Sequence, residues 1–265
     1  MSVFRPAQPR QLGEQTFDTN MRGEDEVSTV LSLVAKGLND GQIARAAGIP
    51  RRTVLDWRQG RLPKRAKRSH CDLCLGKNPR LPERDYSYLL GLYLGDGCIS
   101  ESPRSYRIRI TLDAAYPGIV DACASALEAI LPEKRAWRGK RRNSRCVDVA
   151  MYWNHWPCLI PQYGSGRKHL RRIALVPWQE RIIEREREAF IRGLIHSDGC
   201  RIVANDRGVP SVRYHFSNRS EDIKKLFCDS LDALGINWTR PCGRQIAIYR
   251  QRSVEILDTF VGPKR

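Results

Sequence analysis

The sequence of 265 residues lacks any apolar run long enough to cross a membrane, and its first ten residues lack the apolar core of a signal peptide. A spanning helix needs roughly 18 or more consecutive apolar residues, and a signal peptide needs a shorter apolar stretch behind a basic start. These absences argue against an integral membrane protein and against a secreted one. We therefore expect a cytoplasmic protein with no membrane partner.

The cysteines do not have the pattern of a disulfide framework. They number nine, which is odd, and they are scattered along the chain. Disulfide frameworks are typical of short secreted domains with an even set of cysteines. The sequence therefore predicts reduced thiols.

Acidic residues are also scarce relative to basic ones. The chain has 29 Asp and Glu against 46 Lys and Arg, which gives a formal net charge of +17 and a pI of about 9.8. The hydrophobic fraction of 41% is that of a globular protein. A positive excess of this size favours a polyanionic partner. We expect nucleic acid to be that partner, ahead of an anionic membrane surface.

One short stretch occurs twice, as LLGLYLGDG and, 102 positions later, as IRGLIHSDG. In each copy two small residues lie four positions apart, Gly91 and Gly95 in the first and Gly193 and Ser197 in the second. Small residues at this spacing form one flat stripe on a helix, along which another backbone can approach closely. The repeat therefore predicts two helices that pack against each other.

Each copy ends in Asp-Gly, which places acids at Asp96 and Asp198. The glycine is a natural helix end, but a carboxylate at the negative end of the helix dipole is unfavourable. The same unfavourable acid beside both helices indicates that the two carboxylates meet and hold a cation. The alternative is that they only end the helices by accepting hydrogen bonds from loop amides.

The same order of elements follows each motif. Segments that alternate between apolar and polar residues predict strands, and segments with apolar residues at helical spacing predict helices. The repeat unit is helix, two strands, helix, two strands, helix. The expected strands are 106–112, a strand-loop-strand arm over 134–145, 146–153, 212–217, 236–239 and 245–249. The expected further helices are 119–130, 178–186, 223–234 and 254–261.

Before the repeats, three short helices are predicted at 24–36, 41–47 and 50–58, with a tight turn at Gly48. The run QIARAAGIPRRTVLDW resembles the helix-turn-helix units of transposases and regulators. Ile43, Ala47, Ile49, Val54 and Trp57 would form the inner faces. The alternative is a plain helical hairpin. The residues expected to face a DNA groove are Arg51, Arg52, Thr53 and Arg58.

Basic residues outside the helix-turn-helix are candidates for contacts with phosphate. Those expected to bind DNA are Lys64 and Arg65 in a basic linker, Arg107 and Arg109 on a strand, Lys140 and Arg141 in the arm, and Arg201 and Arg213 in the second repeat. Each of the strand arginines could equally assist the acids or be ordinary surface charge.

A lone Cys-x-x-Cys pair lies between the helix-turn-helix and the first motif, at Cys71 and Cys74. Structural Zn²⁺ needs four ligands. No second such pair is found, and His70 is too close to Cys71 to complete a site. The alternatives are half of a zinc site and two reduced cysteines in a connector, and the second is favoured.

The two motifs with their strands and helices resemble the single-chain LAGLIDADG homing endonucleases over about residues 85–265. The resemblance implies an α+β fold in which a duplicated αββαββα unit forms a pseudo-twofold saddle over double-stranded DNA. It implies catalytic acids at Asp96 and Asp198, with Mg²⁺ bound there and at the preceding Gly95 and Ser197. The family's catalytic lysines match no position with confidence.

The chain is expected to divide into four parts. These are a flexible arm at 1–22, an all-α helix-turn-helix domain at 23–62, a basic linker at 63–84 and the endonuclease-like domain at 85–265. The two repeats are expected at about 85–155 and 186–265, in a monomer with an internal pseudo-dimer.

Two functions remain open. The first is a site-specific endonuclease that cleaves both strands of DNA with Mg²⁺. The second is a DNA-binding transcriptional regulator, because some bacterial sporulation regulators resemble this combination of fold and helix-turn-helix, with the catalytic acids commonly lost. Both acids are present in this chain, which favours the enzyme. His196, inside the second motif, is expected to pack in the core rather than to act as a base.

Overall fold

The computed structural model describes residues 24–61, 71–102, 105–206 and 208–264. The expected arm at 1–22, the linker residues Lys64 and Arg65, and His70 lie outside the described residues. The chain divides into two compact units, residues 1–69 and 70–265. In the described helices, none combines the length and the apolar character that crossing a membrane requires.

The first unit consists of α1 (Glu24–Ala35), α2 (Asp40–Ala47) and α3 (Arg51–Arg58). Asn39 starts α2 through a capping box, in which its side chain and that of Gln42 each accept a backbone N–H at 2.9 Å. Gly48 ends α2 with φ of +64°, the left-handed conformation that glycine tolerates. The apolar residues that the three helices share form one small core: Val30, Ile43, Ile49, Val54 and Trp57. The expected three helices are therefore confirmed.

The second unit contains two copies of the same order of elements. The first copy is α4 (Glu83–Asp96), β1 (Gly97–Ser102), β2 (Ser105–Asp113), α5 (Pro117–Ile130), β3 (Trp137–Lys140), β4 (Cys146–Trp153) and α6 (Trp156–Leu159). The second copy is α8 (Arg187–Asp198), β5 (Gly199–Asp206), β6 (Val209–Ser217), α9 (Glu221–Ala233), β7 (Thr239–Cys242), β8 (Gln245–Ile248) and α10 (Gln251–Phe260). The short helix η1 (Leu73–Leu75) precedes them, and η2 (Lys168–Leu170) and α7 (Pro177–Arg185) connect them.

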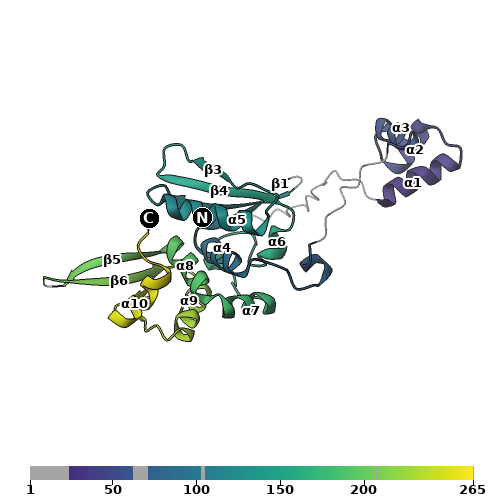
Figure 1. Ribbon diagram of the computed structural model, residues 1–265. Coiled ribbons are helices and arrows are strands. Elements are labelled where there is room, and N and C mark those ends of the chain that lie inside the picture. The colour runs from purple at the N-terminus through teal and green to yellow at the C-terminus, as the bar shows by residue number, and fades with distance from the viewer. Residues whose placement is uncertain (1–23, 62–70, 103–104, 207, 265) are drawn as a thin grey trace, which may run out of the picture. The chain divides into compact units, whose positions relative to one another are not determined.

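Each copy builds one antiparallel sheet of four strands, in the orders β1-β2-β4-β3 and β5-β6-β8-β7. The helices α4 and α8 lie side by side between the two sheets, as Figure 1 shows. One hydrophobic core runs through both copies. The expected duplicated αββαββα architecture is confirmed.

One expected strand was placed wrongly. The apolar residues near 236–239 suggested a strand there, but β7 begins only at Thr239. Ile236 is instead buried in the core, and the backbone N–H of Asn237 donates to Ser253 Oγ at 3.0 Å. The segment before β7 therefore follows α9 as a packed connection.

The contact between α4 and α8 depends on their small residues. A Cβ on Gly91 would lie 2.5 Å from Phe190 O, and a Cβ on Gly193 would lie 2.2 Å from Tyr88 O. One turn further along, a Cβ on Gly95 would lie 2.2 Å from Ser197 Oγ. The helices thus touch backbone to backbone, as the repeated small residues predicted.

The glycines that follow the two aspartates have a different role from the one expected. Gly97 and Gly199 are extended, with φ of −86° and −113°, so they are not left-handed helix caps. A Cβ on Gly97 would lie 2.5 Å from Tyr93 Cα, and one on Gly199 would lie 2.8 Å from Ile195 Cα. Glycine is needed here because each strand leaves against the last turn of its own helix.

Gly193→Ala tests the close approach of the helices. The added methyl group would overlap the backbone of α4, so we expect a loss of about 3 kcal/mol or more in the free energy of unfolding, measured by chemical denaturation. Gly243→Ala is the control, because a Cβ at Gly243 meets nothing within 4 Å. Its expected effect is within about 0.5 kcal/mol. Equal stability of the two variants would contradict the backbone contact.

Candidate functional site

Asp96 and Asp198 are the last residues of α4 and α8. The helices pack at Gly95 and Ser197, one residue before each acid, so their ends are brought together. A Cβ on Gly95 would lie 3.0 Å from Asp198 Oδ2. Asn218 Nδ2 donates to the same oxygen at 2.6 Å. Both expected acids therefore lie at one place, where the two copies meet.

The surroundings disfavour the charged form of both acids. Desolvation by neighbouring protein atoms, together with the charge of Asp198, raises the pKa of Asp96 to about 6, although two lysines act to lower it. Desolvation also raises the pKa of Asp198, although the hydrogen bond from Asn218 opposes this. The two lysines therefore do not fully offset the effect of burial on the acids.

Those lysines, Lys168 and Lys264, were not predicted from the sequence. Lys168 Nζ donates to the carbonyl oxygens of Tyr93, Leu94 and Gly95 at the end of α4, the last two at 3.1 Å. Lys264 Nζ donates to His196 O, near the end of α8, at 2.9 Å. Each cation thus caps the negative end of one motif helix. Desolvation lowers the pKa of Lys168 to about 8 and lowers that of Lys264.

Buried glutamines hold the loop that carries Lys168. Gln162 Nε2 donates to Ala174 O at 2.7 Å, which ties the two ends of the loop together. Gln162 also bonds Gln179 of α7, which donates to Tyr86 Oη of α4 at 2.6 Å. This network fixes the loop against the first motif helix.

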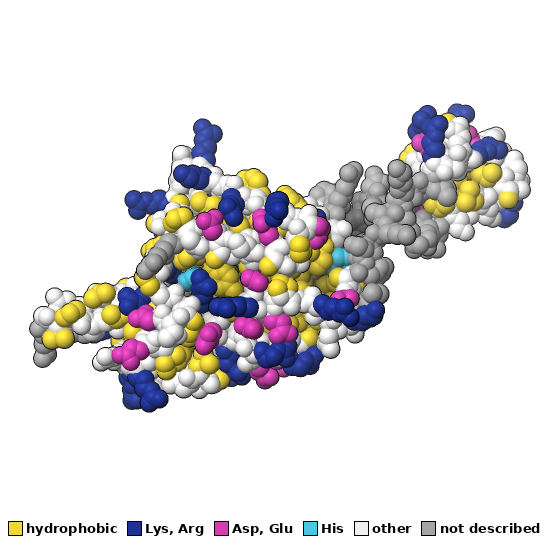
Figure 2. Space-filling view, viewed as in Figure 1, with side chains coloured by type: hydrophobic (Ala, Val, Ile, Leu, Met, Phe, Trp, Pro, Cys, Tyr) yellow, Lys and Arg dark blue, Asp and Glu magenta, His cyan; other side chains and the backbone are white. Residues whose placement is uncertain are grey.

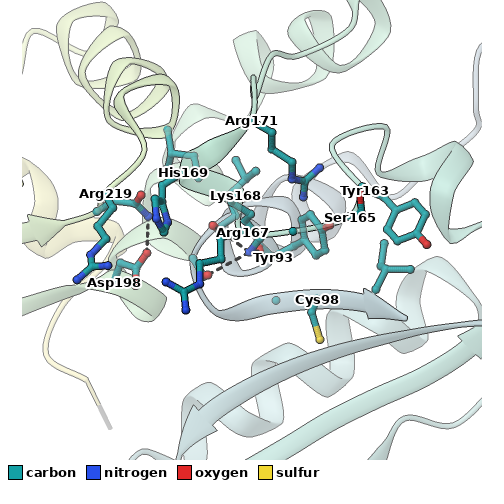
Figure 3. Close-up of a pocket in the computed structure, with 18 of the residues that line it drawn as sticks. Tyr93, Cys98, Tyr163, Ser165, Arg167, Lys168, His169, Arg171, Asp198 and Arg219 are labelled. Atoms are coloured by element: carbon teal, nitrogen blue, oxygen red, sulfur yellow. Dashed lines mark hydrogen bonds between the residues drawn. The ribbon is translucent and has the colours of Figure 1, made fainter. Parts of the chain in front are cut away.

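A cleft of about 630 Å³ lies along this loop, and Asp198 lines one part of it. In Figure 3, Asp198 and Arg219 lie on one side of Lys168 and Tyr163 on the other. The basic lining residues are Arg167, Lys168, His169, Arg171 and Arg219. The cleft is therefore lined by one carboxylate and by several positively charged or polar side chains.

Three motif residues already have hydrogen-bond partners inside the protein. Ser197 Oγ donates to the carbonyl oxygens of Gly193 and Leu194 of its own helix, and Gly95 O accepts from Lys168. His196 is buried, and its Nδ1 lies 2.9 Å from Tyr88 Oη. Burial lowers the pKa of His196 to about 3. His196 is a neutral core residue, as expected.

The outer face of the first sheet carries Arg107 and Arg109, on strand β2. Ile108, Ile110 and Leu112 alternate with them and are buried on the helix side. Arg107 lies over the rings of Trp137 and Tyr152, at 5.4 and 5.7 Å from the ring centroids. Both rings are more than half exposed. The expected basic face is present, and it includes two exposed aromatic residues.

The second sheet repeats part of this arrangement. Arg213 lies on the same face as its partner Ile202, and its guanidinium lies 5.2 Å from the ring centroid of Tyr249. Tyr249 comes directly after Ile248, and Tyr152 comes directly after Met151. Ile248 pairs with Tyr214 of β6, and Met151 pairs with Ile108 at the equivalent position of β2. An arginine stacked on a tyrosine therefore recurs in both copies.

Two expected DNA-binding residues lie on the other face. Arg201 pairs with Tyr214 and forms a two-pronged ion pair with Asp258 of α10 at 2.8 and 2.9 Å. Lys140 shares the helix side of its sheet with Arg138, which pairs with Asp121 of α5. Strand alternation turns these two residues away from the outer face, so a contact of either with DNA stays a prediction.

Other basic residues keep the expected exposure but have partners. Arg141 on the outer side donates to Asp148 at 3.1 Å. In the first unit, Arg58 pairs with Asp40 at 2.8 Å, so α3 uses it to hold α2. Arg51 and Arg52 are exposed at the start of α3, with Thr53 half-buried beside them.

The Cys-x-x-Cys pair is not isolated. Cys71 and Cys74 lie with His155 and Cys158, and their sulfur and nitrogen ligand atoms lie within 4.8 Å of one another. The Cys-x-x-Cys motif does not recur in the sequence, but a histidine and a cysteine supply two further ligand types beside it. His155 and Cys158 repeat the spacing of three residues, but a search for cysteine pairs alone passes over them.

The duplicated order of elements, the two four-stranded sheets and the helices paired at Asp-Gly ends define the architecture. The fold is of the LAGLIDADG type. No protein-family model and no curated protein matches the sequence.

Solved structures do match the fold. The chain is similar to I-DmoI in complex with DNA and Mn, with a TM-score of 0.46 and 17% identity, over 69% of this chain and 98% of that one. It is similar to the N-terminal LAGLIDADG domain of DUF199/WhiA, with a TM-score of 0.43 and 18% identity, over 69% of this chain and 83% of that one. Full-length DUF199/WhiA from Thermatoga maritima matches with a TM-score of 0.42 and 16% identity, over 69% of this chain and 56% of that one.

Positive charge is not gathered on every face of the second unit. Figure 2 shows a face on which Lys and Arg side chains are interspersed with Asp and Glu. The outer faces of the sheets carry Arg107, Arg109 and Arg213.

Asp96→Asn tests the electrostatics of the site in metal-free protein. The folded protein holds the Asp96 proton more tightly than the unfolded chain, because its pKa is about 6 instead of 3.8. The stability contributed by this proton is present below about pH 4 and is lost as the pH rises through about 6. We expect the variant to melt roughly 2–4 °C above the unchanged protein at about pH 7.5, with little difference at about pH 4. Glu101→Gln, on the exposed part of β1, is the control, and a gain of the same size at both pH values would contradict the shifted pKa.

Proposed function

We propose that the chain is a site-specific DNA endonuclease that binds double-stranded DNA and hydrolyses its phosphodiester bonds with a divalent metal ion. The observation that carries the proposal is the meeting of Asp96 and Asp198 at the ends of two helices packed backbone to backbone. Two carboxylates at this position lower the stability of the fold, because each lies at the negative end of a helix dipole.

The donor set fits a hard divalent cation. Carboxylate and main-chain oxygens are the ligands that Mg²⁺ prefers. The raised pKa of Asp96, with Lys168 and Lys264 already present, indicates that the site has room for more positive charge. Asp96 and Asp198 would hold the ion, with the backbone at Gly95 and Ser197 next to it. When bound, Mg²⁺ would polarise the phosphate and lower the pKa of the attacking water.

The two lysines supply the remaining electrostatics. Lys168 is desolvated beside both carboxylates, and the main chain of α4 holds its Nζ in place. A fixed ammonium at this position attracts a phosphate and stabilises the negative charge that grows on it as water attacks. Lys264 has the equivalent position at the end of α8. Each half of the site would thus have one acid and one cation.

The outer sheet faces would hold the DNA. Arg107 and Arg213 present guanidinium groups stacked on Tyr152 and Tyr249, which keeps them extended for phosphate or base edges. In the first unit, Arg51 and Arg52 are exposed at the start of α3, the position from which a recognition helix contacts bases. Binding by both units would lengthen the recognised site.

The second candidate function is a transcriptional regulator that binds DNA without cleaving it. The three-helix unit favours it, because repressors and activators carry the same unit. Both functions share DNA binding, so only cleavage distinguishes them.

The cleavage test uses the purified chain, Mg²⁺ and DNA fragments from its own genomic surroundings. We expect double-strand breaks with the unchanged protein and a loss of more than about 100-fold in rate with Asp96→Asn or Asp198→Asn, since even outer-shell changes at metal sites cost up to that much. DNA affinity should be unchanged or tighter, because each variant removes a negative charge. Binding without any cleavage by all three proteins would contradict the enzyme and support the regulator.

The salt dependence of DNA binding tests the sheet faces. Arg107→Ala and Arg213→Ala should each weaken binding and reduce the slope of log affinity against log salt by about 0.9, the effect of one phosphate contact. Arg138→Ala is the control, because its side chain pairs with Asp121 on the helix side. The measurement is fluorescence anisotropy over a salt series in Ca²⁺ buffer. Slopes that do not differ between Arg107→Ala and Arg138→Ala would remove the first sheet from the interface.

A further inference from the structure

A cluster of three cysteines and one histidine lies apart from the paired aspartates. Cys71 and Cys74 come from the segment around η1, and His155 and Cys158 come from the start of α6. Cys74 Sγ lies 3.3 Å from Cys71 Sγ, 3.3 Å from Cys158 Sγ and 3.2 Å from His155 Nδ1. Cys158 Sγ lies 3.9 Å from the same nitrogen. Four ligand atoms therefore surround one point.

We propose that Cys71, Cys74, His155 and Cys158 bind one structural Zn²⁺. Zn²⁺ in a Cys₃His site is tetrahedral, with bonds of about 2.3 Å to sulfur and about 2.0 Å to nitrogen. Such a site places its sulfur atoms roughly 3.8 Å apart and its nitrogen roughly 3.6 Å from each sulfur. Four of the six ligand pairs, at 3.2 to 3.9 Å, match that arrangement to within about half an ångström, and the other two lie within 4.8 Å.

A disulfide does not account for the cluster. The sulfur of Cys74 is equally close to two others, at 3.3 Å from both Cys71 and Cys158. A disulfide needs about 2.05 Å and joins only two sulfurs, which would leave the third thiol and the imidazole beside it without a function. Four ligands of the types that Zn²⁺ prefers, in a closed set, indicate a structural site instead of a catalytic one.

The local backbone directs the ligands to the same side. Gly76 ends η1 with φ of +68°, and its N–H donates to Leu73 O at 3.1 Å, so the chain turns back immediately after Cys74. His155 is buried, with its ring against Trp153 at 5.1 Å between centroids. Its Nε2 has no hydrogen-bond partner among the described residues, and its Nδ1 points at the sulfurs. As a zinc ligand, the imidazole would offer Nδ1 and carry its proton on Nε2.

The site joins parts of the chain that are far apart in sequence. Cys74 and His155 are separated by 81 residues. The segment from Cys71 to Gly76 contains only a single turn of helix, so it has few backbone bonds of its own. A bound Zn²⁺ would fix this segment to α6 and hold the approach to α4, the first motif helix. The ion would stabilise the fold and take no part in cleavage.

The test measures metal content in the full chain purified without chelators. We expect about one zinc per chain by mass spectrometry of metals, falling to background in Cys74→Ser and Cys158→Ser. Cys146→Ser, a half-buried cysteine outside the cluster, and Asp96→Asn with Asp198→Asn should keep the zinc. Protein stripped by chelator and loaded with Co²⁺ should show the intense visible bands of a tetrahedral thiolate site, and Zn²⁺ should abolish them.

The outcomes are separable even if a variant fails to fold. Because the Co²⁺ spectrum is recorded on the unchanged chain, it reports the site without any substitution. Absence of stoichiometric zinc together with no thiolate bands in Co²⁺ would overturn the proposal. So would stoichiometric iron in place of zinc, a disulfide found between Cys74 and a neighbour in the folded protein, or loss of zinc in Cys146→Ser.

Discussion

The fold depends on the close contact between α4 and α8. These helices can touch backbone to backbone only because Gly91 and Gly193 have no side chain at the crossing. Each helix then continues into the first strand of its own sheet through a glycine that also tolerates no side chain. The position of both sheets, and therefore of every arginine on their outer faces, follows from this one contact. A single methyl group at the crossing would move both sheets together.

The same contact creates electrostatic repulsion at the site. Packing the helices in parallel register brings two negative dipole ends to one place, and the sequence adds a carboxylate to each. Lys168 and Lys264 reduce this repulsion by donating hydrogen bonds to carbonyl oxygens in the last turns of the two helices. They do not remove it, since the pKa of Asp96 remains near 6. The ionised carboxylates are thus held in a fixed position without being fully stabilised by the lysines. A bound cation would stabilise them further, which is the physical basis of the proposed metal binding.

The sequence predicted the features that local periodicity encodes. The paired small residues, the order of elements and the alternation in β2 and β4 all appear in short windows, and the structure confirms them. Contacts between distant segments leave no such trace. Lys168 begins the short helix η2 in the connection between the copies and Lys264 lies beyond the last helix, so nothing nearby in the sequence indicates that both lie at the ends of the motif helices. His155 lies 81 residues from Cys74, and Arg201 sits in a strand without regular alternation, so its face could not be assigned.

The two copies share their scaffold but differ at their acids. Both sheets carry an arginine stacked on a tyrosine at equivalent positions, so the outer faces of the two copies share this arrangement. At the helix ends, Asn218 holds Asp198 and lowers its pKa against the effect of burial, whereas the charge of Asp198 raises that of Asp96. The lysines also differ in origin, because Lys168 comes from the connection between the copies and Lys264 from beyond α10. Duplication within a single chain permits this divergence, since each half can change without changing the other. Binding of a cation shared by the two acids would therefore have to displace a proton from Asp96 below about pH 6.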